Sequence, residues 1–238
     1  MNKHPMMKHK ILKHLHQLRS ISRKKHHHLL HHLHKKHKFS KKTLFYVKEY
    51  GPHSHVARTI IKESAKILLF ASIISSFGGL AIEHIKVLFI SIIPLIILMP
   101  ALNDMIGDYG TIISSKFSTL LYEGRVGNDW RTNKELKKMF LQIMTIALIM
   151  ASISGVISLI ISKFFGYDLS LATIIKVLLI AILDVGILVT ILFLIAIVAG
   201  LYFYNKQEDP NNFLIPITTS VADFGNMILL AFLVLILF

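Results

Sequence analysis

The sequence predicts an all-α integral membrane protein, and two observations support that class. Apolar residues make up 53% of the 238 residues, above the roughly 45–50% of typical soluble domains, and the mean hydropathy is +0.59. These residues are concentrated in stretches with few charges, each at least as long as the roughly 20 residues with which a helix crosses a bilayer. The apolar stretches are residues 59–82, 86–106, 139–162, 171–204 and 213–238.

A basic tail at 1–57 precedes the expected transmembrane domain at 58–238. The tail holds 14 of the 27 Lys and Arg residues, a single acid and 13 of the 14 histidines. Three interpretations stay open for it. It is a solvated, partly disordered arm, an arm or surface helix held by anionic lipid headgroups, or an imidazole site for zinc or nickel. It has no apolar core of a secretory signal peptide.

The first two apolar stretches are expected to form a tight helical hairpin, because the first ends near His84 and the second begins at Lys86. The second helix is expected to be broken. Pro100 removes a backbone hydrogen bond, and Gly107 and Gly110 weaken a helix. Such a break in a membrane segment is tolerated where it faces protein or a watery cavity.

The other three apolar stretches follow a polar loop at 123–138. The third, 139–162, contains small residues that allow neighbouring helices to approach closely. The fourth, 171–204, is too long for one untilted crossing. A second polar loop, 205–212, leads into the last stretch, 213–238. The sequence therefore predicts five transmembrane helices in each subunit.

The distribution of positive charge orients these helices. The tail and the loop at 123–138, which has five Lys and Arg residues, are the most basic connections, and the opposite loops have about one each. Short basic loops stay in the cytoplasm. We therefore expect a multi-pass protein of the plasma membrane with a cytoplasmic N-terminus and an external C-terminus.

The sequence has none of the usual signatures of an enzyme. It has no cysteine, which excludes disulfides, thiolate metal sites and cysteine nucleophiles. It has no nucleotide-binding loop, no His-Glu-x-x-His and no Gly-x-Ser-x-Gly, and the patterns of intramembrane aspartyl proteases are missing. We expect no enzymatic activity and no nucleic-acid partner.

Acidic side chains within apolar stretches are the best evidence for function, because a carboxylate at membrane depth costs several kcal/mol and is rarely there by accident. Carboxylate, amide and hydroxyl oxygens suit Mg2+, Ca2+ or Mn2+, and Mg2+ keeps several waters while using one or two carboxylates. Spacings of three and four place Thr219, Asp223 and Asn226 on one helical face. The candidate metal ligands are Asp223, Asp108, Asn103, Asp104, Thr219 and Asn226.

Other roles stay open for three of the acids that lie in or beside the apolar stretches. Asp108 and Asp223 could be structural carboxylates, with neighbouring hydroxyls, Lys116 or Lys176 satisfying Asp223. Asp184 has three equal interpretations: an acid that supports the site, a proton site or a helix-packing partner.

Two segments resemble the MgtE-type magnesium transporters and their eukaryotic solute-carrier relatives. The run DPNNFLIPITTSVAD at 209–223 resembles the segment that opens the last helix of that family, and PALNDMIGDYG at 100–110 resembles its Pro…Gly-Asn-x-Gly segment. The resemblance covers about 58–238. It implies five helices per subunit, a homodimer and a cation pore lined by helices two and five, with Asp223 as a pore ligand near the two-fold axis.

One position departs from that family. Asp108 follows Gly107 where the family has asparagine, which adds negative charge to the path. We therefore expect a homodimeric transporter of divalent cations in the lipid bilayer. Mg2+ is the first candidate, and Ca2+, Mn2+ and Zn2+ are alternatives. Two other classes stay open: a proton- or sodium-coupled carrier of a small cationic solute with Asp108 and Asp184 as relays, and a non-transporting scaffold with a lipid-binding tail.

Overall fold

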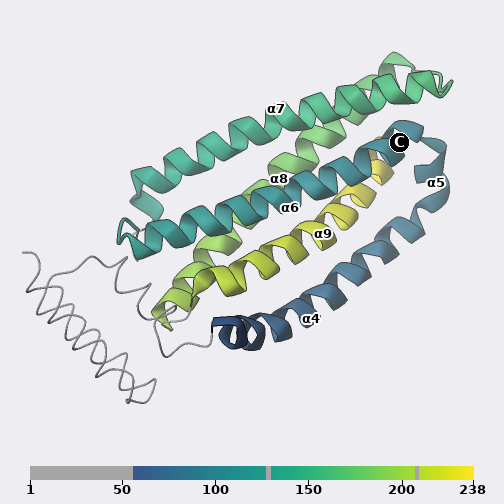
Figure 1. Cartoon of the computed structure of the whole chain (residues 1–238). Helices are drawn as coiled ribbons and strands as arrows, with labels where there is room; N and C mark the ends of the chain where they lie inside the picture. Colours follow the sequence, from purple (N-terminus) through teal and green to yellow (C-terminus); the bar gives the residue numbers. More distant parts are fainter. Residues whose placement is uncertain (1–55, 127–129, 207–208) are drawn as a thin grey trace, which may run out of the picture. The chain divides into compact units, whose positions relative to one another are not determined.

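The computed structural model describes residues 56–126, 130–206 and 209–238, and every regular element within those ranges is helical. The chain divides into two units. The first, Met1–Lys62 with Tyr122–Gly124, falls mostly outside the described residues, and so do the basic tail and its three interpretations. The second, Glu63–Leu121 with Arg125–Phe238, holds the predicted transmembrane helices (Figure 1).

Apart from α6, the long helices follow the apolar stretches of the sequence to within a few residues. Within the described ranges, four are long and apolar enough to cross a membrane: the Ile67–His84 part of α4, and the whole of α7, α8 and α9. They confirm an all-helical, multi-pass membrane protein. In order, the elements are α4 (Val56–His84), α5 (Lys86–Ser91), α6 (Ile93–Tyr122), the 3-10 turn η2 (Trp130–Thr132), α7 (Lys134–Phe164), α8 (Leu171–Asn205) and α9 (Pro210–Leu237).

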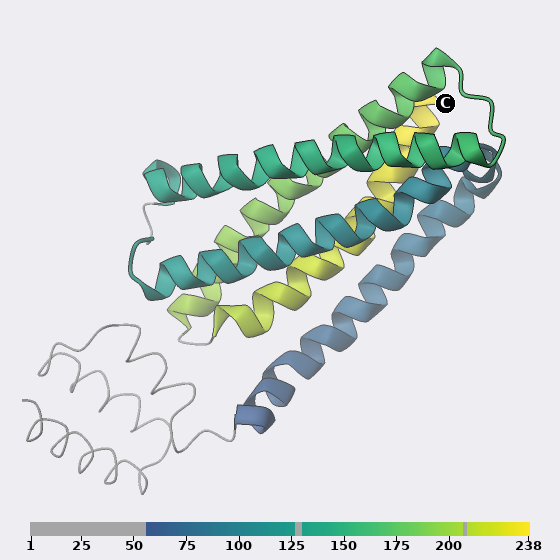
Figure 2. The ribbon, with the colours of Figure 1, turned by 45° about the horizontal axis from the view of Figure 1, so that its top comes forward.

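The long helices of the second unit lie side by side, and α6, α7, α8 and α9 alternate in direction (Figures 1 and 2). The short connection after α4 reverses the chain into α5 and α6, as expected from the few residues between the first two apolar stretches. α4 contacts α9 at Gly78, where an added Cβ would lie 3.0 Å from Sδ of Met227 and 3.2 Å from Cα of Phe224. Both helices are therefore in position to contribute to one site.

The predicted break in the second helix is wrong in position. α6 runs without interruption through Pro100, Gly107 and Gly110, and the chain is interrupted earlier, at Ile92, between α5 and α6. One proline removes only one backbone donor, and a membrane helix tolerates that loss. Gly110 has a different use: an added Cβ there would lie 3.2 Å from Cβ of Thr218 on α9. This glycine lets two helices approach each other.

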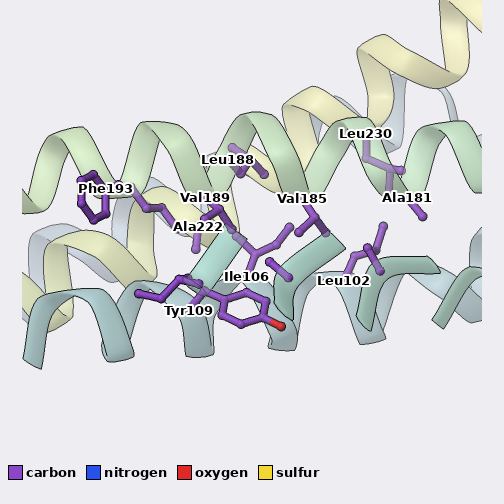
Figure 3. Packing of buried hydrophobic residues seen from close by; sticks show 14 of the residues in the cluster. Leu102, Ile106, Tyr109, Ala181, Val185, Leu188, Val189, Phe193, Ala222 and Leu230 are labelled. Carbon is purple, nitrogen blue, oxygen red and sulfur yellow. The ribbon is translucent and has the colours of Figure 1, made fainter. Parts of the chain in front are cut away.

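The core of the second unit lies between α6, α8 and α9 (Figure 3). Leu102 and Ile106 of α6 are fully buried and point toward α8, where Val185 and Val189 are also fully buried. In lipid the hydrophobic effect does not drive helices together, so close packing and interhelical hydrogen bonds hold them. Small residues at the contacts matter for that reason.

Helix starts follow local capping rules. Oδ1 of Asn133 accepts hydrogen bonds from the backbone N–H groups of Glu135 (2.9 Å) and Leu136 (3.2 Å), so α7 begins at Lys134 inside the loop expected at 123–138. Asp209 caps α9 in the same way, since its Oδ1 accepts from the N–H of Asn211 at 3.0 Å. Such caps satisfy backbone donors that the first helical turn leaves open.

Candidate cation site

Asp223 lies where α4, α6 and α9 meet. Its Oδ1 accepts a hydrogen bond from Nδ2 of Asn103 at 2.9 Å, and its Oδ2 accepts one from the hydroxyl of Ser75 at 3.4 Å. Both donors are neutral. Across the described ranges no Lys or Arg pairs with this carboxylate, so Lys116 and Lys176 are not its partners. Its negative charge is therefore hydrogen-bonded but not neutralised.

A second amide extends this arrangement. Nδ2 of Asn226 donates to Oδ1 of Asn103 at 3.0 Å, and Asn103 in turn donates to Asp223. Asn226 is fully buried, and its own Oδ1 has no hydrogen-bond partner in the described structure. We call Asn103, Asp223 and Asn226 the amide–carboxylate network. It places one carboxylate and a buried, unpartnered amide oxygen near one level of the bundle.

The threonines of α9 have different positions. The hydroxyl of Thr219 donates to the carbonyl of Ile215 at 2.9 Å and so bonds its own helix. Thr218 is fully buried and faces α6, where its hydroxyl lies 3.0 Å from that of Ser114. Thr218 therefore joins α9 to α6, and the partly buried Thr219 lies one turn before Asp223 on the same helical face.

Asp104 and Asp108 do not join the amide–carboxylate network. Both are exposed on α6 together with Ser115 and Thr119. The spacings between these residues follow the turns of a helix, so they share one face, on which the apolar Ala101 and Ile112 are also exposed. We call Asp104, Asp108, Ser115 and Thr119 the polar stripe. Carboxylates within a membrane helix usually face protein or a water-filled cavity, so the stripe is unsuited to contact with lipid tails.

The backbone beside the stripe is also open. A Cβ added at Gly107 would meet no atom within 4 Å, so another surface or a hydrated ion has room to approach α6 between Asp104 and Asp108. Among the described residues of one chain, no three His, Asp or Glu side chains gather as a metal-binding group. The sequence-predicted ligands thus divide into the network, the stripe and Thr219.

The structure adds three polar side chains that were not among the candidate metal ligands: Ser75, Ser114 and Thr218. Ser75 stands beside Ser76 in an otherwise apolar part of α4, and a hydroxyl pair in such a stretch is the signal that could have drawn attention to it. Ser114 lies six residues after Asp108, and Thr218 directly precedes Thr219. A serine in a membrane helix can also bond its own backbone, so the hydroxyl alone does not predict a partner on another helix.

Asp184 lies apart from these groups. It sits on α8, is fully buried, and neither of its carboxyl oxygens has a hydrogen-bond partner among the described side chains and backbone. Val185 and Ala181 beside it are also fully buried. A buried polar group without a partner destabilises a fold.

We expect Asp184→Ala to stabilise the protein by about 1–3 kcal/mol, because it removes an unsatisfied buried group of that cost. Thermal unfolding of the purified protein in detergent measures the effect. The control is Ala181→Ser, which adds a hydroxyl one turn away and should not raise the melting temperature. A fall in the melting temperature of Asp184→Ala would contradict this expectation and would mean that the buried side chain contributes more to stability than its unsatisfied oxygens cost.

The comparison with protein families covers the part of this arrangement that lies on α6 and α9. The family model MgtE, divalent cation transporter, matches residues 99–233, which is more than half of the chain and includes the network, the stripe and Thr219. No curated protein and no solved structure matches the chain. By the extent of that match, the chain belongs to the MgtE family of divalent cation transporters.

Proposed function

We propose that the protein carries Mg2+ across the membrane along a path that two copies of the chain form between their α6 and α9 helices. The polar stripe is the observation that supports the proposal most strongly. It leaves Asp104 and Asp108 exposed on a helix that lies among four membrane-spanning candidates. A second copy facing the stripe would shield these carboxylates from lipid. The two copies would together place two Asp104 and two Asp108 side chains along one path.

The proposed topology counts α6 as a fifth crossing. It has 30 residues and packs along α8 and α9, and at about 1.5 Å per residue it exceeds the thickness of the hydrocarbon core. Five crossings put the termini on opposite sides. The basic residues before α4 and around the start of α7 then favour a cytoplasmic N-terminus in a plasma membrane.

Mg2+ fits the donors better than a softer ion. The network and the stripe offer carboxylate and amide oxygens and no sulfur or imidazole, and such hard donors suit Mg2+, Ca2+ or Mn2+. Few carboxylates lie close together in one chain, which suits an ion that keeps most of its waters and uses one or two carboxylates.

Each candidate residue has a proposed role. Asp223 supplies the central carboxylate, and Asn103 and Asn226 orient it while offering amide oxygens. Asp104 and Asp108 attract the hydrated cation along α6, and Thr219 contributes a hydroxyl beside Asp223. Because Asp223 has only neutral hydrogen-bond partners, its charge is available to a cation.

The test is Mg2+ uptake into proteoliposomes. Because the protein has no cysteine of its own, cross-linking through a single introduced cysteine reports dimer assembly in the same samples. We expect uptake that Ca2+ or Mn2+ inhibits, no dependence on a proton or sodium gradient, and cross-linking of two copies through Ser115→Cys on the stripe. Ile153→Cys, exposed on α7, is the matched control and should not cross-link.

Different failures of this test have different meanings. Uptake that requires a proton gradient would favour the coupled carrier of a small cationic solute. Absence of any cation flux would favour the non-transporting scaffold. Cross-linking at Ile153→Cys in place of Ser115→Cys would leave the cation assignment intact and would move the subunit interface from α6 to α7.

A further inference from the structure

A cavity of about 250 Å3 lies away from the cation site, between η2, the first turns of α7 and the middle of α8. Its lining joins cationic, aromatic and aliphatic side chains, among them Trp130, Arg131, Lys137, Phe140, Phe193 and Leu194. None of these residues belongs to the network or to the stripe. The proposed transport of Mg2+ therefore leaves the cavity without a use.

The cavity has a cationic part and an apolar part. Arg131 and Lys137 are exposed, whereas the rings of Phe140 and Phe193 pack together with centroids 4.9 Å apart. Lys137 precedes Phe140 by three residues, about 4.5 Å along the helix axis. The lining is therefore positively charged near the start of α7 and aromatic one turn further along the helix.

Among the described residues, no acid neutralises the two cations. Glu135, two residues before Lys137, pairs instead with Arg125 at 2.7 Å. Within the described part of the chain neither Arg131 nor Lys137 has a carboxylate partner. The guanidinium of Arg131 lies 5.4 Å from the centre of the Trp130 ring. Contact with a ring face leaves guanidinium N–H groups available, and these groups match the geometry of phosphate.

The residues at the cavity are of the types that are common at the membrane interface. Tryptophan and basic residues concentrate where headgroups meet hydrocarbon. Here Trp130 and Arg131 stand just before α7, and Lys134, Lys137 and Lys138 are exposed on its first turns. On the other wall, Leu194 of α8 is 48% exposed, so the apolar part opens toward the surface that faces lipid.

We propose that this cavity binds an anionic phospholipid, with the phosphate between Arg131 and Lys137 and the upper acyl chain against Phe140, Phe193 and Leu194. Positive charge without a protein partner complements the headgroup, and the apolar part complements the chain. A soluble phosphate would occupy only the cationic part, so a lipid accounts for the whole lining.

The test uses the full-length protein in detergent and titrates phosphatidylglycerol or phosphatidylcholine while thermal unfolding is followed. A ligand that binds the native state raises the melting temperature. We expect phosphatidylglycerol to stabilise more than phosphatidylcholine. The double variant Arg131→Gln/Lys137→Gln should raise the apparent Kd for phosphatidylglycerol about tenfold or more, because it removes both phosphate contacts. Lys163→Gln removes one positive charge at the far end of α7 and should leave the Kd unchanged.

Two further measurements identify the source of the phosphate. Leu194→Trp should weaken the binding of phosphatidylglycerol although Arg131 and Lys137 are unchanged. Inorganic phosphate alone should not shift the melting temperature. Equal stabilisation by inorganic phosphate would overturn the lipid assignment in favour of a free anion. An unchanged Kd in the double variant would overturn the site itself and point to the basic tail. Mg2+ uptake is measured separately, so failure here is distinct from failure of the transport proposal.

Discussion

Asp223→Ala is expected to reduce Mg2+ uptake by about 30-fold or more in proteoliposomes. Removing one member of a desolvated charge pair costs about 2–5 kcal/mol, and about 1.4 kcal/mol corresponds to a factor of ten. Asp223 is the carboxylate whose contacts are all neutral, Asn103 at 2.9 Å and Ser75 at 3.4 Å. Neither of these partners carries a negative charge that could replace the carboxylate.

Two controls separate a transport effect from a folding effect. Ser220→Ala removes a hydroxyl on the same helix that bonds only the backbone carbonyl of Pro216 at 2.7 Å, and we expect normal uptake. Asp223→Asn keeps the shape and an oxygen acceptor but removes the charge, so it should fold like the wild type and transport poorly. Wild-type uptake by a correctly folded Asp223→Ala protein would rule out the central role of this residue.

Gly200→Ala is expected to destabilise the protein by about 1–3 kcal/mol, the range found for overpacked cores. An added Cβ on α8 would lie 2.6 Å from Cε1 and 2.8 Å from Cδ1 of Phe117. That ring is fully buried, so it has little freedom to move. Thermal unfolding in detergent measures the loss, with the melting temperature falling relative to the wild type.

The same helix supplies the control. At Gly186 an added Cβ would lie 3.5 Å from Cδ2 of Leu148, which is an ordinary contact, so Gly186→Ala should be neutral or slightly stabilising through better helix propensity. Phe117→Leu in the Gly200→Ala background should recover part of the stability. A Gly200→Ala protein as stable as the wild type would mean that α6 and α8 are less closely packed than described.

The helices themselves could be predicted from the sequence. Long apolar runs must satisfy their backbone groups internally in lipid, and a helix is the structure that does so within one segment. The extents of α7, α8 and α9 follow from that rule and from caps such as Asn133 and Asp209. The break expected between Pro100 and Gly110 was wrong, because a glycine that permits close helix contact has the same local appearance as a glycine that ends a helix.

The candidate site shows a similar division. Spacing on α9 was enough to place Asp223 and Asn226 on one face. Asn103 and Asp104 are neighbours in sequence, yet one joins the network and the other is exposed on the stripe. Successive residues of a helix point about 100° apart, so their roles depend on which side of α6 faces α9.

The sequence by itself determined the membrane class, the approximate extents of α7, α8 and α9, and most of the oxygen donors, because hydropathy, capping and side-chain chemistry are local properties. Only the tertiary structure decided that Asp223 meets Ser75 and Asn103, that Thr218 and not Thr219 faces Ser114, and that Asp184 lies alone. Those outcomes depend on the rotation of each helix against its neighbours. That rotation is set by close contacts between distant segments, such as Gly110 with Thr218 and Gly200 with Phe117.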